Sequence, residues 1–142
     1  MRTSDFFKKR LLRKGKPDLL KASKALEMSE IKLERAQNLF ENCFYEESII
    51  TSYTSMFQAA RALLFKDGIT EKSHACVVSY LRENYAKSLG YDHISWLDTY
   101  RLERHESFYG LDPSELDKKE SEDALNKSEK FFNSVEDIIG NT

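Results

Sequence analysis

A short stretch near the end of one predicted helix gathers side chains that could do chemistry: Arg104-His105-Glu106-Ser107-Phe108-Tyr109-Gly110. It combines a permanent cation, an imidazole, a carboxylate and a phenol. A helix brings side chains three and four residues apart onto one face, and Arg101 lies one turn earlier. Guanidinium and phenol groups can hold a phosphate. We therefore predict a phosphate- or nucleotide-binding set of Arg101, Arg104 and Tyr109.

The same stretch raises the question of catalysis, for which the candidates are Arg104, His105 and Tyr109. A phenol has a pKa of about 10, so ionising it at neutral pH costs ~4 kcal/mol. An imidazole titrates near pH 6.5, which makes His105 the better base, four residues after Arg101. These charged residues could equally form a solvated, ion-paired helix surface. The residues alone leave open whether the protein is an enzyme.

Long amphipathic helices must position this stretch. The chain has 142 residues, enough for one domain, and only five Gly and two Pro. Apolar periodicity predicts helices over 5–13, 18–42, 45–66, 70–87 and 92–109, and a last one from Asp112-Pro113 to Gly140. Ser4 and Thr70 are the expected caps of the first and fourth. Short breaks indicate antiparallel neighbours, so the predicted fold is all-α: an up-and-down bundle of four to five long helices with a short extra N-terminal helix.

Charge is unevenly distributed along the chain. The net charge is −2, which gives no global case for nucleic acid. Up to Pro17, however, seven Lys and Arg residues face a single acid, Asp5. This start could be a nucleic-acid arm or simply a solvated helix. We divide the chain into a basic N-terminal segment with a short helix, 1–16, and a helical bundle, 17–142.

No pattern in the sequence predicts a metal or a cofactor. Cys43 and Cys76 stand alone in apolar helical patterns, without zinc spacing, and free thiols suit a reducing, cytoplasmic location. His74 with Glu71 lacks a third ligand, and His93 reads as a structural residue at a helix start. We expect no metal and no cofactor. No apolar run reaches the ~18–20 residues of a membrane span, so no membrane association is expected either.

Several features together resemble the HEPN family (higher eukaryotes and prokaryotes nucleotide-binding). The stretch 43–64 places Tyr53, Met56-Phe57 and the run Ala60-Arg61-Ala62-Leu63-Leu64 as its central helix does. Gly68 follows, then His74 at the start of the next helix, then an Arg-rich helix ending in Tyr109-Gly110. The resemblance covers about residues 18–139. It implies a HEPN-like bundle that forms a homodimer.

The resemblance also implies partners and activities. Such domains pair with a minimal nucleotidyltransferase in toxin–antitoxin modules, and some are metal-independent ribonucleases that use an Arg, four to six residues, then a His. Here Tyr109 stands where that His would follow Arg104, and only three residues separate Arg101 from His105. The preferred hypothesis is a nucleotide- or phosphate-binding interaction module, the partner of a nucleotidyltransferase. The alternatives are a ribonuclease that cleaves RNA, and a purely structural oligomerising bundle.

Overall fold

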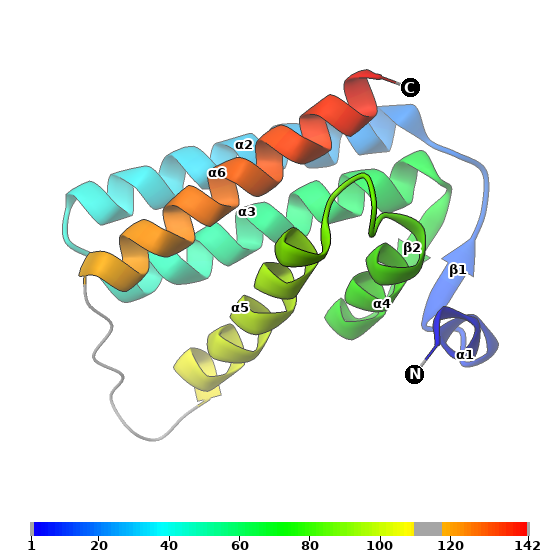
Figure 1. Cartoon of the computed structure of the whole chain (residues 1–142), viewed down its shortest axis with the longest axis horizontal. Coiled ribbons are helices and arrows are strands. Elements are labelled where there is room, and N and C mark those ends of the chain that lie inside the picture. Colours follow the sequence, from blue (N-terminus) through cyan, green and yellow to red (C-terminus); the bar gives the residue numbers. More distant parts are fainter. Residues whose placement is uncertain (1, 110–117, 142) are drawn as a thin grey trace.

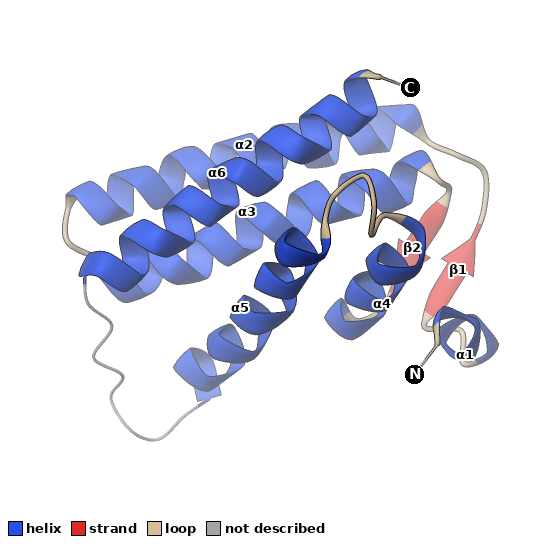
Figure 2. Cartoon of the chain, viewed as in Figure 1, coloured by secondary structure: helices blue, strands red, loops and turns tan. Residues whose placement is uncertain are grey.

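Six helices and one small two-stranded sheet make up the part of the chain that the structure describes (Figures 1 and 2). This computed structural model describes residues 2–109 and 118–141, and all of their side chains except those of 103–109. The predicted all-α fold is confirmed. In chain order the elements are α1 (Thr3–Lys8), β1 (Leu12–Lys14), α2 (Leu19–Glu41), α3 (Tyr45–Lys66), β2 (Ile69–Glu71), α4 (His74–Asn84), α5 (Tyr91–Tyr109) and α6 (Lys118–Gly140).

The central element is α3, which contacts α2, α4, α5, α6 and β2. Figure 1 shows α2, α3 and α6 running side by side along the long axis, with α4 and α5 set at an angle to them. Much of α3 is buried because its small residues let neighbours approach closely: Ala59, Ala60 and Ala62 are fully buried. Tyr53, Met56 and Leu63 fill the core between them.

Buried serines join the long helices. The Ser29 hydroxyl of α2 donates to the backbone carbonyl of Ser55 in α3, and the Ser55 hydroxyl donates to the carbonyl of Ser29, both at 2.7 Å. The Ser48 hydroxyl donates to the carbonyl of Ala36 at 2.9 Å. On α6, the Ser128 hydroxyl donates to the carbonyl of Ser52 at 3.0 Å. These bonds satisfy polar groups that burial would otherwise leave unpaired.

The N-terminal segment differs from the prediction. The helix expected over 5–13 is wrong beyond Lys8, and its N-cap is Arg2 rather than Ser4. Arg10 adopts a φ of 59°, which no helix accommodates, and the chain then pairs as β1 antiparallel to β2, with Leu12 opposite Glu71. Leu12 is only 1% exposed, so the strand is held by apolar burial as well as by the ladder.

The other helices test the remaining boundaries. Those expected over 18–42, 45–66 and 92–109 are confirmed to within about one residue, as is the end of the last helix at Gly140. The fourth is wrong at both ends: Thr70 lies in β2, Ser73 caps α4 by accepting from the Cys76 N–H, and α4 ends at Asn84. The predicted helix start at Asp112-Pro113 lies outside the described residues.

The two cysteines have different environments. Cys76 is fully buried in α4, as its apolar pattern predicts. Cys43 was expected in an apolar helical pattern, and this is wrong: it lies exposed between α2 and α3 with a φ of 66°. Phe44 beside it is 55% exposed, so the apolar residues of this connection do not reach the core.

Gly68 joins the N-terminal segment to the bundle. It has a φ of +78°, and its carbonyl accepts a 2.6 Å hydrogen bond from the Gly15 N–H. A Cβ at this position would collide with the Gly15 carbonyl oxygen and lie 2.8–2.9 Å from backbone atoms of Lys16 and Pro17. Only glycine fits here without displacing that backbone. In the described part of the chain, no helix combines the length and the apolarity needed to cross a membrane.

Candidate functional site

The helix that carries the predicted phosphate-binding set is α5. Its backbone is helical through Tyr109, so positions 101, 105 and 109 follow one another at four-residue intervals. Buried Ile94, Leu97 and Tyr100 hold this helix against the bundle. The side chains of Arg104, His105 and Tyr109 lie outside the described residues, as does Gly110. Their joint role as a binding or catalytic set stays a prediction.

Arg101 is the described member of the set. Its side chain is 28% exposed, and its Nε and Nη2 both donate to Oδ1 of Asp98, at 3.0 and 2.8 Å. The other oxygen of Asp98 accepts from Nη2 of Arg82 in α4 at 3.2 Å. One carboxylate thus lies between two guanidinium groups, which leaves this cluster with one net positive charge. A cation cluster of this kind favours a phosphate at α5.

A small hollow next to Tyr100 has the opposite charge. It has a volume of about 120 Å³ and is lined by Ile49, Tyr100, Glu120, Asp123 and Lys127. The Lys127 ammonium lies over the rings of Trp96 and Tyr100, 5.8 and 5.7 Å from their centroids. Two carboxylates against one ammonium disfavour a phosphate on this side of α5.

His74 has an aromatic environment rather than a metal site. The Tyr53 hydroxyl lies 2.6 Å from its Nδ1, and the ring stacks on Phe57 with centroids 3.8 Å apart. Glu71, the carboxylate that we considered as a second ligand, forms an ion pair with Arg61. Within the described residues no group of three His, Cys, Asp or Glu side chains could hold a metal ion.

His93 also packs against neighbouring side chains. Its ring stacks on Trp96 at 4.5 Å between centroids, and the Ser134 hydroxyl lies 3.2 Å from Nε2. Burial between α5 and α6 lowers the pKa of His93 below its usual 6.5, because a buried imidazolium loses hydration. His93 is therefore neutral at physiological pH.

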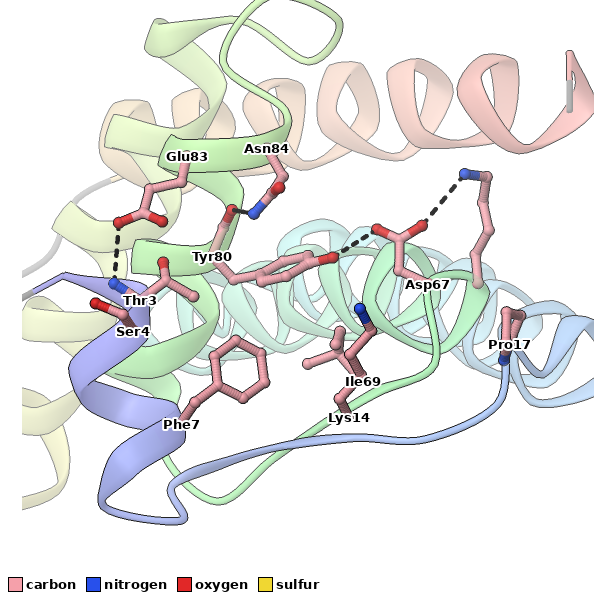
Figure 3. A pocket seen from close by; sticks show the side chains of 11 residues that line it. Thr3, Ser4, Phe7, Lys14, Pro17, Asp67, Ile69, Tyr80, Glu83 and Asn84 are labelled. Carbon is pink, nitrogen blue, oxygen red and sulfur yellow. Dashed lines mark hydrogen bonds and ion pairs between the residues drawn. The ribbon is translucent and has the colours of Figure 1, made fainter.

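A large open pocket was missed by the sequence reasoning. It has a volume of about 630 Å³ and lies where the N-terminal segment meets the end of α3 and the last turns of α4 (Figure 3). Asp67, just after α3, accepts the hydroxyl hydrogens of Tyr80 and Tyr85 on one oxygen, at 2.9 and 2.6 Å. Burial, with Asp67 beside them, raises the pKa of both phenols above 10, so both stay protonated. The pocket joins residues more than 60 positions apart, and no local sequence pattern signals it.

Comparison with known proteins agrees with this architecture. The family model described as "HEPN domain" matches residues 22–138. The protein named putative toxin MJ0142 of Methanocaldococcus jannaschii is 28% identical over 118 residues, 82% of this chain and 80% of that protein. Putative toxin MJ0605 of the same organism is 30% identical over 69 residues, 45% of this chain and 52% of that protein. The family match extends from α2 to the last turn of α6, and the chain therefore belongs to the HEPN domain family.

Proposed function

We propose that this HEPN chain is a nucleotide- or phosphate-binding interaction module, the helical partner of a separate minimal nucleotidyltransferase in a toxin–antitoxin pair. Family membership and two relatives named as putative toxins support a role of this kind. The observation that carries the proposal is Arg101, a half-buried cation fixed on an anchored helix just before Arg104, His105 and Tyr109. An intracellular location in the cytoplasm fits this role.

Arg101 has capacity left for a phosphate. A guanidinium has five N–H donors, and Asp98 takes two of them, so three remain. Among the described residues Nη1 has no hydrogen-bond partner. Because Asp98 holds the guanidinium in place, less conformational entropy is lost when a phosphate oxygen binds. Arg101→Ala should therefore weaken nucleotide triphosphate binding about tenfold in calorimetry, as expected for one charge-assisted contact.

Tyr109 would be the acceptor in the partnership. The nucleotidyltransferase would transfer a nucleoside monophosphate from a triphosphate to the phenol oxygen, with release of pyrophosphate and the phenol proton. Co-expression with the proposed nucleotidyltransferase partner should give a complex and a mass increase of one nucleoside monophosphate. Tyr109→Phe should abolish the increase. Tyr91→Phe, at a 70% exposed position of the same helix, is the matched control. Absence of both complex and modification would refute the proposal.

A homodimer belongs to the same proposal. We place its interface on the face of α5 that carries Leu102, which is 57% exposed beside Arg101. A two-fold axis there would bring two Arg101 clusters near one another. Leu102→Glu should convert the dimer to a monomer in light scattering, whereas Leu19→Glu, 62% exposed at the start of α2, should not.

The second candidate is a metal-independent ribonuclease. Its support is that α5 carries Arg104 directly before His105, with Arg101 one turn earlier on the same face as His105. In that enzyme the imidazole would take the proton of the ribose 2′-hydroxyl, and Arg104 would stabilise the charge on the phosphorus centre. Incubation with RNA in EDTA should then yield 2′,3′-cyclic phosphate ends, lost in His105→Ala and Arg104→Ala. Intact RNA after this incubation would exclude the ribonuclease. Replacing Arg101, Arg104 and Tyr109 together by alanine tests the third possibility, because unchanged binding of nucleotide and of the partner would leave only a structural bundle.

A further inference from the structure

The pocket of about 630 Å³ is built by two parts of the chain that the family match separates. Lys14, Phe7 and Thr3 come from the N-terminal segment, which precedes the matched residues 22–138. Lys66 and Tyr80 come from the helices of the bundle. Figure 3 shows Phe7, Lys14 and Tyr80 around one opening, and the Tyr80 ring lies between Glu83 at one end and Asp67 at the other. A pocket of this size can hold a small organic molecule.

Both carboxylates of this pocket already accept hydrogen bonds. Asp67 accepts two phenol hydrogens on Oδ2 and lies 3.5 Å from the Lys66 ammonium through Oδ1. A Glu83 oxygen accepts from the Thr3 N–H at 2.9 Å. A cationic ligand would therefore have to compete with existing donors for the Asp67 carboxylate.

The donors, in contrast, are largely unused. The Lys14 ammonium has no hydrogen bond or ion pair with the described residues. The Lys66 ammonium has its 3.5 Å contact with Asp67 and lies 5.9 Å from the centroid of the Tyr85 ring. Because two phenols already stabilise the Asp67 carboxylate, Lys66 can turn toward an incoming anion without leaving Asp67 unpaired. Each ammonium offers three donors. A ligand rich in acceptors fits this balance.

The remaining surface of the pocket suits a ring. The rings of Phe7 and Tyr80 border the same space from α1 and α4, and Ile69 of β2 lies beside Phe7 (Figure 3). Aromatic and aliphatic side chains bind flat apolar groups by stacking and by burial of apolar area. A fully hydrated, compact anion would leave this part of the pocket unfilled.

We propose that this pocket binds a small aromatic anion, with its phosphate or carboxylate between Lys14 and Lys66 and its ring against Phe7 and Tyr80. This site is distinct from the proposed phosphate set on α5, and it depends on the N-terminal segment as well as on the HEPN bundle. Binding there would also fix the N-terminal segment on the bundle, because one ligand contacts both.

Phenyl phosphate is the first probe. Its binding to the full chain is measured by two-dimensional NMR and by calorimetry. We expect binding, weakened about tenfold by Lys14→Ala and by Lys66→Ala, since each removes one charge-assisted contact. Lys16→Ala, an exposed lysine two residues away that does not line the pocket, is the matched control and should change affinity less than twofold. Benzoate in place of phenyl phosphate distinguishes a carboxylate from a phosphate ligand.

Further variants protect the test from misfolding. Ser4 is exposed at the pocket wall, so Ser4→Trp should fill the space and abolish binding while circular dichroism and the melting temperature remain unchanged. In Arg101→Ala, phenyl phosphate should still shift the amide resonances of Phe7 and Tyr80, which line this pocket, and this separates the pocket from any binding at α5. Three results would each overturn the proposal. They are equal affinity for benzylamine, loss of binding in Arg101→Ala but not in Lys14→Ala, and no binding at about 10 mM phenyl phosphate.

Discussion

Replacing Gly68 by alanine should destabilise the junction between the N-terminal segment and the bundle. The new Cβ would collide with the Gly15 carbonyl and lie within 2.9 Å of Pro17 N, and these are backbone atoms that no rotamer change can move. A positive φ costs an L-residue about 1–2 kcal/mol by itself. Relieving the collision would also break the Gly15–Gly68 hydrogen bond, a further loss of about 1 kcal/mol.

The loss of stability in Gly68→Ala can be bounded by considering two outcomes. If the segment stays in place, the strain and the lost bond together destabilise the protein by about 2–3 kcal/mol. If the segment detaches, the burial of Leu12 is lost instead, and a fully buried leucine contributes about 1.5–3 kcal/mol. Together the two routes predict a decrease of about 1.5–3 kcal/mol in the free energy of unfolding, measured by urea denaturation.

Hydrogen exchange tells the two routes apart. Detachment should remove the protection of the Gly15 and Lys72 amides, which donate across this junction, while amides in the middle of α3 stay protected. Gly140→Ala is the control, because its Cβ meets nothing within 4 Å and alanine favours a helix. The reasoning would be refuted by a Gly68→Ala protein as stable as the parent with full protection at Gly15.

Three further predictions concern buried polar groups. Tyr85→Phe removes one of the two phenol donors of Asp67 and should lower the free energy of unfolding by about 1–2 kcal/mol in urea denaturation. The control, exposed Tyr91→Phe, should lower it by less than about 0.5 kcal/mol, and equal effects would contradict the role of Asp67. Ser55→Ala should cost about 1 kcal/mol through its bond to Ser29, while exposed Ser23→Ala should not destabilise; a neutral Ser55→Ala would show that the pairing adds nothing. Because burial lowers the pKa of His93, the unfolded chain binds its proton more readily, so its contribution to stability is complete above pH 6.5 and lost as the pH falls through the lower folded pKa. Melting temperatures between about pH 7.5 and 5.5 should therefore decrease less in His93→Gln, and identical pH dependence would contradict the shift.

The long helices could be predicted because their signals are local. Asp18 caps α2 by accepting from the Lys21 N–H, and Gly68 follows the end of α3, so apolar periodicity between such signals gives boundaries close to the observed ones. Residues 101–109 could be assigned to a helix for the same reason. The predicted roles of their side chains stay predictions.

The strands and the pocket could not be predicted, because both depend on contacts between distant residues. Leu12–Lys14 is too short for a period-two pattern, and only its pairing with Ile69–Glu71 makes it a strand. Thr70 and Ser73 are both good caps, and the pairing of β2 decides between them. In the sequence, Asp67 only marks the end of a helix. Its role as the acceptor for the Tyr80 and Tyr85 hydroxyls depends on contacts 13 and 18 residues away.

The reciprocal bonds of Ser29 and Ser55 have a consequence for how α2 can lie along α3. A slip of one helical turn, about 5.4 Å, would separate both hydroxyls from their carbonyl partners inside the buried contact. Each unpaired group would cost about 1–3 kcal/mol. A stripe of smooth aliphatic residues would tolerate such sliding far better. The serines therefore fix the axial register of α2 against α3, and the helix pair keeps a single alignment.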